Sequence, residues 1–261
     1  MQHKKFLLPL ALISWIIIVG CKEPPITISQ DQIEAVFSPG TTIRLFMDST
    51  SQPVNVGRTG GPNVYDFSTL PFYQYDSCSV FSVTQIPKLA SRFPSNAVTS
   101  NEEGNTVYPV FSFSNHKFYR EGRGRISSDT TEWYQHFIPA AEWLRFPVTF
   151  NTQFSTTNTV VVDTTYVNGI PTNTSSDTSS AGTEYVDGYG TLLLPGGLAF
   201  ECLRIRGVAS FPKTSKMFQF WTREGAAVLI ESDNSQPDTG VVKREYVIYF
   251  SPQTRNQNTR D

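Results

Sequence analysis

The stretch Tyr189-Gly190-Thr191-Leu192-Leu193-Leu194-Pro195-Gly196-Gly197-Leu198-Ala199-Phe200 decides the fold class. Two apolar runs flank Pro-Gly-Gly. Proline presets a negative φ and glycine adopts a positive one, so the stretch predicts a β-hairpin. Gly188 and Gly190, on either side of Tyr189, predict a bulge or a close approach of another backbone.

Short apolar runs that end at Gly, Pro, Asn or Asp recur along the rest of the chain. Together with 19 Phe, 11 Tyr, 17 Gly and 17 Pro among 261 residues, they favour strands joined by turns over helices. We therefore expect an all-β, antiparallel β-sandwich-like domain, with one short helix near 29–37 capped by Asp31. The twelve predicted strands are 42–47, 64–67, 78–84, 107–113, 131–137, 143–150, 160–167, 185–194, 198–211, 217–222, 226–231 and 241–250.

The N-terminus has the layout of a secretory signal. Lys4 and Lys5 precede an apolar run over 6–19, which is short for a membrane-spanning helix. The run ends in Ile18-Val19-Gly20-Cys21, which resembles the lipobox of bacterial lipoproteins. We expect cleavage after residue 20 and a diacylglyceryl group with palmitate-type acyl chains on Cys21, which together anchor the chain to a lipid bilayer.

The predicted organisation follows from this anchor. Residues 1–20 form the signal peptide, 21–38 the lipidated cysteine and a tether containing Pro24-Pro25, and 39–250 the β-rich domain. Within the domain, 168–182 is expected to be an exposed loop, and 251–261 a polar C-terminal tail. Lys22 is not the Asp of an inner-membrane retention signal, so the outer membrane is preferred, on its periplasmic or its surface face.

Net charge argues against nucleic acid as a partner. The chain carries 21 basic and 23 acidic residues. Removal of residues 1–20 takes away two lysines, which leaves 19 basic residues and a formal charge of −4. No excess of positive charge is present to neutralise a phosphate backbone.

Cys78 and Cys202 remain after the lipidated cysteine. Both lie in predicted strands, and an exported protein keeps disulfides, so they form either one bridge or two buried free thiols. The sequence has neither a CxxC pair nor a Cys/His cluster, so we expect no metal and no cofactor.

Several further motifs are β-structural in character, and Asp66 is expected to cap a turn with its carboxylate. In chain order they are Ile26-Thr27-Ile28, Ser38-Pro39-Gly40-Thr41, Gly60 to Ser68, Leu144-Arg145-Phe146-Pro147-Val148-Thr149-Phe150, Asp187 to Leu192, and Leu203-Arg204-Ile205. Taken together they resemble a family of uncharacterised secreted proteins of Bacteroidota. Members of this family usually have Trp-Asp-Phe-Ser where this chain has Tyr65-Asp66-Phe67-Ser68. The resemblance implies an envelope location and a β-rich fold, and it brings no catalytic residues.

Signals for catalysis are weak. His116 and His136 form no HExxH, and the Gly-x-Ser-x-Gly elbow that would place a nucleophile is missing from the sequence. The basic segment 120–125 is interpreted as a solvated hairpin tip, with anion binding as the alternative. A glycosidase needs two carboxylates that flank the scissile bond. The candidates for such a pair are Glu132, Glu142, Glu184 and Asp187.

Aromatic residues are the stronger functional signal. Tyr73, Tyr75, Trp133 and Tyr134 belong to aromatic clusters that lie on both faces of strands or in turns, so some rings are expected to lie outside one core. The alternative is that a two-layer protein buries both faces. We expect a non-enzymatic domain that binds a glycan, a protein or another envelope component through these rings, and a polysaccharide-directed hydrolase is the alternative.

Overall fold

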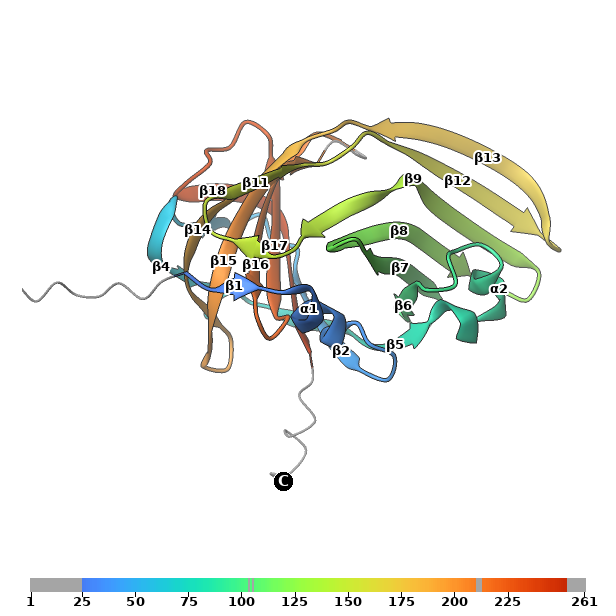
Figure 1. Cartoon of the computed structure of the whole chain (residues 1–261), viewed down its shortest axis with the longest axis horizontal. Coiled ribbons are helices and arrows are strands. Elements are labelled where there is room, and N and C mark those ends of the chain that lie inside the picture. The colour runs from blue at the N-terminus through green and yellow to red at the C-terminus, as the bar shows by residue number, and fades with distance from the viewer. Residues whose placement is uncertain (1–24, 103, 105, 210–212, 253–261) are drawn as a thin grey trace, which may run out of the picture.

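The computed structural model describes residues 25–102, 104, 106–209 and 213–252, and these form an all-β, sandwich-like fold (Figure 1). Within these residues, sixteen strands make one continuous sheet with the path β11-β14-β15-β16-β17-β18-β2-β5-β6-β7-β8-β9-β12-β13. β3 pairs with β18, and β4 pairs with β14. β1 (Thr27–Ile28) and β10 (Val148–Thr149) form a separate two-stranded sheet. Pairing is antiparallel except between β4 and β14.

The large sheet has two halves that face one another. The first half contains β2 (Thr42–Asp48), β3 (Pro53–Asn55), β4 (Gly60–Asp66), β11 (Thr152–Ser155), β14 (Thr183–Leu194), β15 (Leu198–Ala209), β16 (Ser215–Thr222), β17 (Ala227–Asp233) and β18 (Val241–Pro252). The second half contains β6 (Val98–Ser100), β7 (Val107–Ser114), β8 (Lys117–Ile126), β9 (Thr131–Arg145), β12 (Thr159–Val167) and β13 (Ile170–Ser179).

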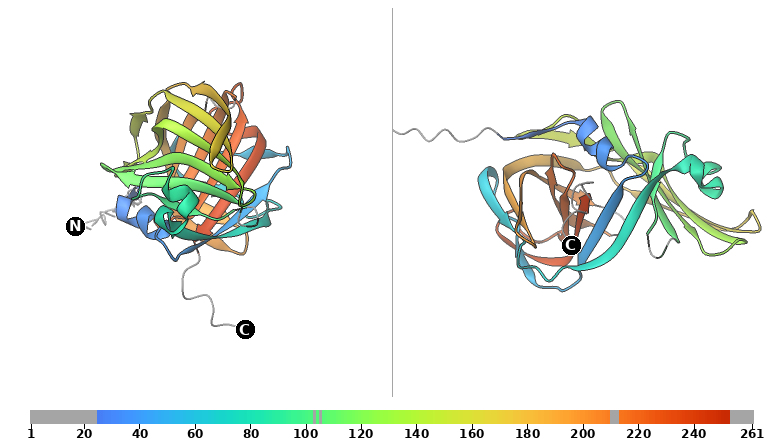
Figure 2. Two further views of the ribbon diagram at one scale, coloured as in Figure 1. Left: turned by 90° about the vertical axis from the view of Figure 1, so that its right-hand side faces the viewer. Right: turned by 90° about the horizontal axis from the view of Figure 1, so that it is seen from below.

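One strand belongs to both halves. β5 (Tyr73–Ser82) pairs with β2 along its first part and with β6 through Val80–Ser82. From below, the first half curls round while the second half fans away from it (Figure 2). The two walls of the sandwich are therefore held together by backbone hydrogen bonds as well as by packing.

The hairpin predicted over residues 189–200 is confirmed. β14 and β15 pair up to Leu194↔Leu198, and Gly196 and Gly197 adopt φ of +81° and +75° between them. The register shifts between Val186 and Gly188, as the glycines indicated. At Gly190 a side chain would overlap the backbone of Asn63 in β4, so the predicted close approach is also present.

Three clusters of buried side chains make up the core. The largest lies between the two halves and contains Trp221, Leu144 and Ile205. A second lies on the opposite face of the first half, around Phe220 and Tyr65. The third packs under the 3₁₀ turn η1 (Val83–Gln85) and the short helix α2 (Pro87–Ala90), on the outer face of the second half.

The predicted tether is too long at its C-terminal end. Ile28 and Ile33 are fully buried in the central cluster, so 26–37 belongs to the folded domain. Helix α1 (Gln30–Val36) forms where a helix was expected, but Ser29 is the N-cap and its N–H donates to Gln32 Oε1 at 2.9 Å. Asp31 lies in the first turn and is not the cap. Residues 1–20, Cys21 and the Pro24 end of the tether lie outside the described residues.

The predicted loop at 168–182 is wrong over most of its length. Residues 170–179 form β13, which pairs with β12 throughout. Its side chains are exposed on both faces, apart from half-buried Ser179, so hydrophobic periodicity gave no signal for it. Asp66 does cap a turn as expected, because its Oδ1 accepts from Ser68 N at 3.0 Å and from Ser68 Oγ at 2.6 Å.

The last strand closes the middle of the sheet. β18 pairs with β17 on one side and with β2 on the other, with Val247 opposite Asp48. Beside this pairing Arg244 forms a fully buried ion pair with Asp48, and its Nε donates to Thr50 O at 3.0 Å. Of the tail predicted at 251–261, Ser251 and Pro252 end this strand, and the remainder lies outside the described residues. None of the helices in the described part of the chain is long and apolar enough to cross a membrane.

Candidate ligand-binding cleft

Two neighbouring cavities lie between the two halves of the sheet. Their volumes are about 470 and 450 Å³, each in the usual range for a small-molecule site. Both are lined by Arg120, Arg123, Trp143 and Met217, so they form one cleft with a shared waist. We call them the apolar cavity and the polar cavity, according to their walls.

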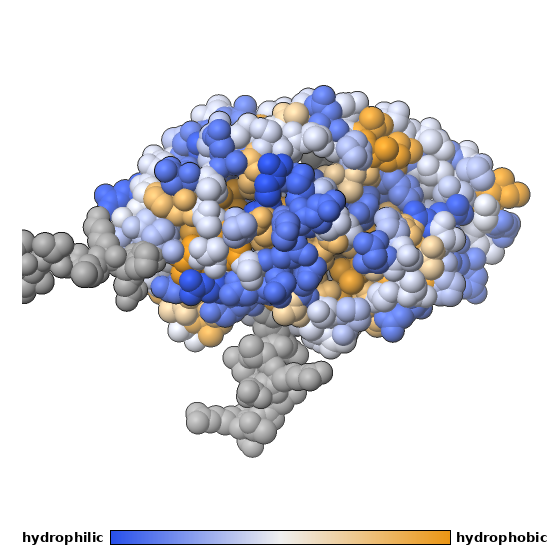
Figure 3. Space-filling model, in the orientation of Figure 1, coloured by the Kyte–Doolittle hydropathy of each residue, from blue (hydrophilic) through white to orange (hydrophobic). Residues whose placement is uncertain are grey.

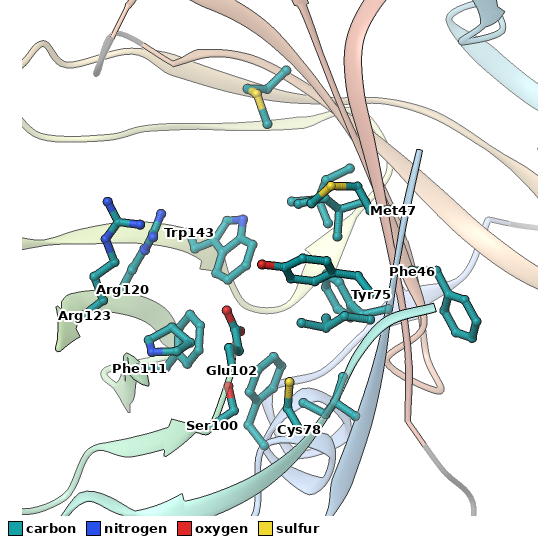
Figure 4. A pocket seen from close by; sticks show the side chains of 18 residues that line it. Phe46, Met47, Tyr75, Cys78, Ser100, Glu102, Phe111, Arg120, Arg123 and Trp143 are labelled. Atoms are coloured by element: carbon teal, nitrogen blue, oxygen red, sulfur yellow. The ribbon is translucent and has the colours of Figure 1, made fainter. Parts of the chain in front are cut away.

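Side chains from both halves of the sheet line the apolar cavity. Figure 4 shows Arg120 and Arg123 on the opposite side of it from Tyr75 and Met47, with Trp143 between them. Polar side chains are few here and include Ser100 and Glu102. The apolar lining consists of Phe37, Ile43, Leu45, Phe46, Met47, Pro109, Phe111, Trp143, Met217, Leu229, Ile248 and Phe250.

The polar cavity is lined mainly by hydroxyl, amide and carboxyl groups. These come from the second half through β9, β12 and β13, from the first half through β14, β16 and β17, and from the loops at 156–157 and 180. The polar lining consists of Gln135, Glu142, Thr156, Thr157, Thr159, Ser179, Ser180, Glu184, Gln219 and Glu231.

A bulge in β8 brings both arginines to the cleft. Residues three apart in a regular strand point to opposite faces. The register between β8 and β9 shifts between Arg120 and Gly122, and Gly122 adopts φ of +151°, so Arg120 and Arg123 both line the cleft. Segment 120–125 is therefore a strand interior, and its interpretation as a solvated hairpin tip was wrong.

Aromatic rings of β9 hold the two guanidinium groups. Arg120 Cζ lies 5.3 Å from the ring centre of Phe137, and Arg123 Cζ lies 5.1 Å from that of Trp133. Cation–π contacts of this kind fix a guanidinium without using its hydrogen-bond donors. Arg123 Nε is buried and has no hydrogen-bond partner among the described residues, so this donor is uncommitted.

Gln219 joins the two walls at the waist. Its Oε1 accepts from Trp143 Nε1 of the second half and from Trp221 Nε1 of the first half, both at 3.0 Å. The two indole rings meet edge to face, with ring centres 5.7 Å apart. A single side chain thus satisfies both indole donors and fixes the spacing of the walls.

Glu184 is the most perturbed carboxyl group of the cleft. A Cβ at Gly207 would overlap both of its carboxylate oxygens, so the glycine leaves the space that the carboxyl occupies. Its Oε2 is buried without a hydrogen-bond partner in the described chain. Burial raises the pKa of Glu184 from 4.5 to about 7, although Arg206 nearby acts in the opposite direction.

The four predicted aromatic residues do not form one surface. Tyr75 lines the apolar cavity and is 41% exposed, and Trp133 stands behind Arg123. Tyr73 is exposed and lines neither cavity. Tyr134 is fully buried in the third cluster, and its hydroxyl donates to Glu132 Oε2 at 2.7 Å, so its inclusion in a binding surface was wrong. On the face shown in Figure 3, apolar residues form separate patches among hydrophilic ones.

Of the two alternatives for Cys78 and Cys202, the disulfide is not formed. Cys78 and Cys202 are both buried free thiols. Cys78 lies in β5 and lines the apolar cavity, whereas Cys202 lies in β15 and belongs to the second cluster. The two strands belong to different parts of the sheet, and burial raises the pKa of both thiols. The open alternative, two core cysteines, is therefore the one that the structure supports.

The other candidate acids are held in ion pairs. Glu132 pairs with Lys88 at 3.1 Å, Glu142 with Lys117 at 2.7 Å, and Asp187 with Arg204 at 2.5 Å. His136 is half-buried beside Phe93, and burial lowers its pKa. The described residues contain no group of three or more His, Cys, Asp or Glu that could hold a metal ion.

No protein-family model, curated protein or solved structure matches the chain. The site is therefore argued from its own geometry. The signal that could have located it was the Arg-x-x-Arg spacing around Gly122. In a strand this spacing places both arginines on one face only if a bulge intervenes.

Proposed function

We propose that this protein is a lipid-anchored envelope protein whose β-domain binds a ligand, without chemical conversion, in the cleft between its sheet halves. The observation that carries the proposal is the shared waist of two cavities, where two ring-stacked arginines face an apolar floor on one side and a polar floor on the other. Cavities in which a few polar groups converge on apolar walls are the usual form of ligand sites.

Thermal unfolding in the presence of candidate ligands tests this proposal. The suitable protein is the chain without residues 1–20 and with Cys21→Ser, which keeps every described residue. A ligand at 100 times its Kd adds about 2.7 kcal/mol of stability. At this chain length that corresponds to a rise in Tm of roughly 5–10 °C. Met217→Trp fills the waist and abolishes the rise, whereas Val241→Trp, at an exposed position outside the cleft, keeps it. The proposal fails if soluble oligosaccharides, envelope proteins and amphiphiles all leave Tm unchanged.

A hydrolase is the second candidate, and Glu184 favours it. Glu184 lies over Gly207, and the cross-strand row Gly207, Met217, Glu231 continues along the polar cavity. Gly207, which lies under the Glu184 carboxyl, is two strands away from Glu231, a spacing of roughly 10 Å. This spacing is near the upper limit for the two carboxyl groups of a glycosidase that act on opposite sides of the glycosidic bond. Turnover of a polysaccharide that Glu184→Gln abolishes and Glu224→Gln retains would replace the binding proposal with this one.

The anchor is tested separately. Radiolabelled palmitate is expected to label the wild-type protein in a bacterial host and to leave the Cys21→Ala variant unlabelled and outside the membrane fraction. The lipid anchor is refuted if this variant is labelled as strongly as the wild type.

A further inference from the structure

We propose that the ligand of the cleft is an amphiphile, with an apolar chain in the apolar cavity and an anionic headgroup at Arg123. This inference rests on the proposed function and narrows its ligand from any envelope component to one chemical class. Three features of the cleft lead to it.

The first feature is the division of the lining. Twelve apolar side chains, most of them from the two sheet halves, line one cavity, whereas hydroxyl, amide and carboxyl groups dominate the other. A sugar chain without an apolar part would leave the hydrophobic floor of the first cavity exposed to water, which is unfavourable in proportion to the exposed area. A hydrocarbon chain covers that floor.

The second feature is the position of the positive charge. Arg120 and Arg123 stand at the waist, where an apolar chain in one cavity meets a polar group in the other. Glu102 and Arg120 each already interact with another group of the protein, so neither is assigned to the ligand. Arg123 lines both cavities with its guanidinium fixed over Trp133, so its outer N–H groups are placed to donate to a carboxylate or phosphate oxygen in the cleft, while its Nε is buried without a partner among the described residues.

The third feature is the lining of the polar cavity, which an extended headgroup would meet. Beyond the waist lie Thr156, Thr159 and Ser180, whose hydroxyl groups suit a hydroxylated or phosphorylated headgroup. Glu184 and Glu231 line the same cavity, and they disfavour a headgroup with several negative charges. The chemistry therefore points to one acidic group next to the chain, with polar, uncharged groups further out.

Intrinsic fluorescence measures this binding directly. The chain without residues 1–20 keeps three tryptophans: Trp143 lines both cavities, Trp133 contacts Arg123, and Trp221 shares the Gln219 acceptor with Trp143. The probes are octanoate, dodecanoate and dodecyltrimethylammonium below their micelle concentrations, together with a soluble oligosaccharide. We expect affinity for the carboxylates to rise about tenfold for every two added carbons while the cavity fills. Dodecanoate is expected to bind at least tenfold more tightly than the cation with the same chain.

Matched variants separate headgroup from chain. Arg123→Gln removes the preference for the anion and keeps the dependence on chain length, while Arg125→Gln, at an exposed position of the same strand outside both cavities, keeps both. Leu229→Asp, on the apolar floor, weakens all chain-bearing probes, and circular dichroism verifies its fold.

Each result of the binding experiments tests a different part of the proposal. Equal affinity for the two charged dodecyl probes overturns the assignment of Arg123, and affinity that does not depend on chain length overturns that of the apolar cavity. Binding of the oligosaccharide alone overturns the amphiphile and leaves the proposed function in place. Failure of every probe, with an unchanged Tm for all ligand classes, overturns both.

Discussion

Replacement of Glu184 by glutamine changes how the stability of the protein depends on pH. The folded state raises the pKa of this carboxyl from 4.5 to about 7 because it buries the group over Gly207. Between these values the folded state keeps a proton that the unfolded state has lost, so the free energy of unfolding falls as pH rises. The contribution of the group is complete below pH 4.5 and lost above about pH 7.

The size of the effect follows from the shift. Each pKa unit is worth about 1.4 kcal/mol, so the wild type carries a penalty of up to about 3 kcal/mol at pH 8. Glutamine has the shape of the protonated acid and no charge at either pH. We expect Glu184→Gln to match the wild type at pH 4.5 and to exceed its stability by about 2–3 kcal/mol at pH 8. The charged groups that face the carboxyl are Arg206 of its own half, Glu231, and Arg120, Arg123 and Glu142 of the opposite wall.

Urea unfolding of the lipid-free chain at pH 4.5, 6 and 8 measures the difference. Glu224→Gln, an exposed turn residue, is the matched control and is expected to follow the wild type at each pH. Parallel curves of stability against pH for the wild type and Glu184→Gln would show that Glu184 is ionised in the folded protein, and the argument from burial would then be wrong.

Three further predictions concern the core. Asp48→Asn leaves Arg244 as a buried charge without its counter-ion and is expected to lower the free energy of unfolding by about 3–5 kcal/mol in urea, so a loss below 1 kcal/mol would contradict the buried pair. Tyr134→Phe removes a buried hydrogen bond and is expected to lower the free energy of unfolding by about 1–2 kcal/mol in urea. Tyr73→Phe changes an exposed ring and is expected to lower it by less than about 0.5 kcal/mol. Equal losses in the two variants would refute the difference in burial. The thiols of Cys78 and Cys202 are buried, so we expect both to react with a disulfide reagent at pH 8 only after the protein is unfolded. If fewer than two thiols react in the unfolded, unreduced chain, the two cysteines form a bridge.

The sequence predicts most of the strands because their apolar residues alternate or run together. The Pro-Gly-Gly hairpin, the bulge beside Gly188 and the Asp66 turn are local features, and each depends on the conformational preference of one or two residues. β13 was missed because both of its faces are solvated, so beyond Ile170 and Pro171 it has no apolar residue that could alternate with polar ones. Its pairing with β12 stabilises it, and such pairing is not visible in a single segment.

The cleft could be predicted only in part. Tyr75 and Trp133 were singled out as exposed rings, and Glu184 as one of four acids, but which wall each would face depends on how the sheet folds back on itself. Arg123 was assigned to solvent because a bulge that changes its direction has no signature beyond a glycine. Long-range register therefore decides the site, and short-range propensity decides the strands.

The position of β18 between β17 and β2 has a consequence for how the chain acquires its structure. β2 pairs with a strand that is synthesised much later, since Asp48 lies opposite Val247. The middle of the sheet cannot close until β18 has emerged from the ribosome. Pairings between residues so far apart in sequence form slowly, because the entropy of a long loop is lost before any contact compensates it. We therefore expect the nascent sheet to stay open between the synthesis of β2 and that of β18, and to close once β18 is available.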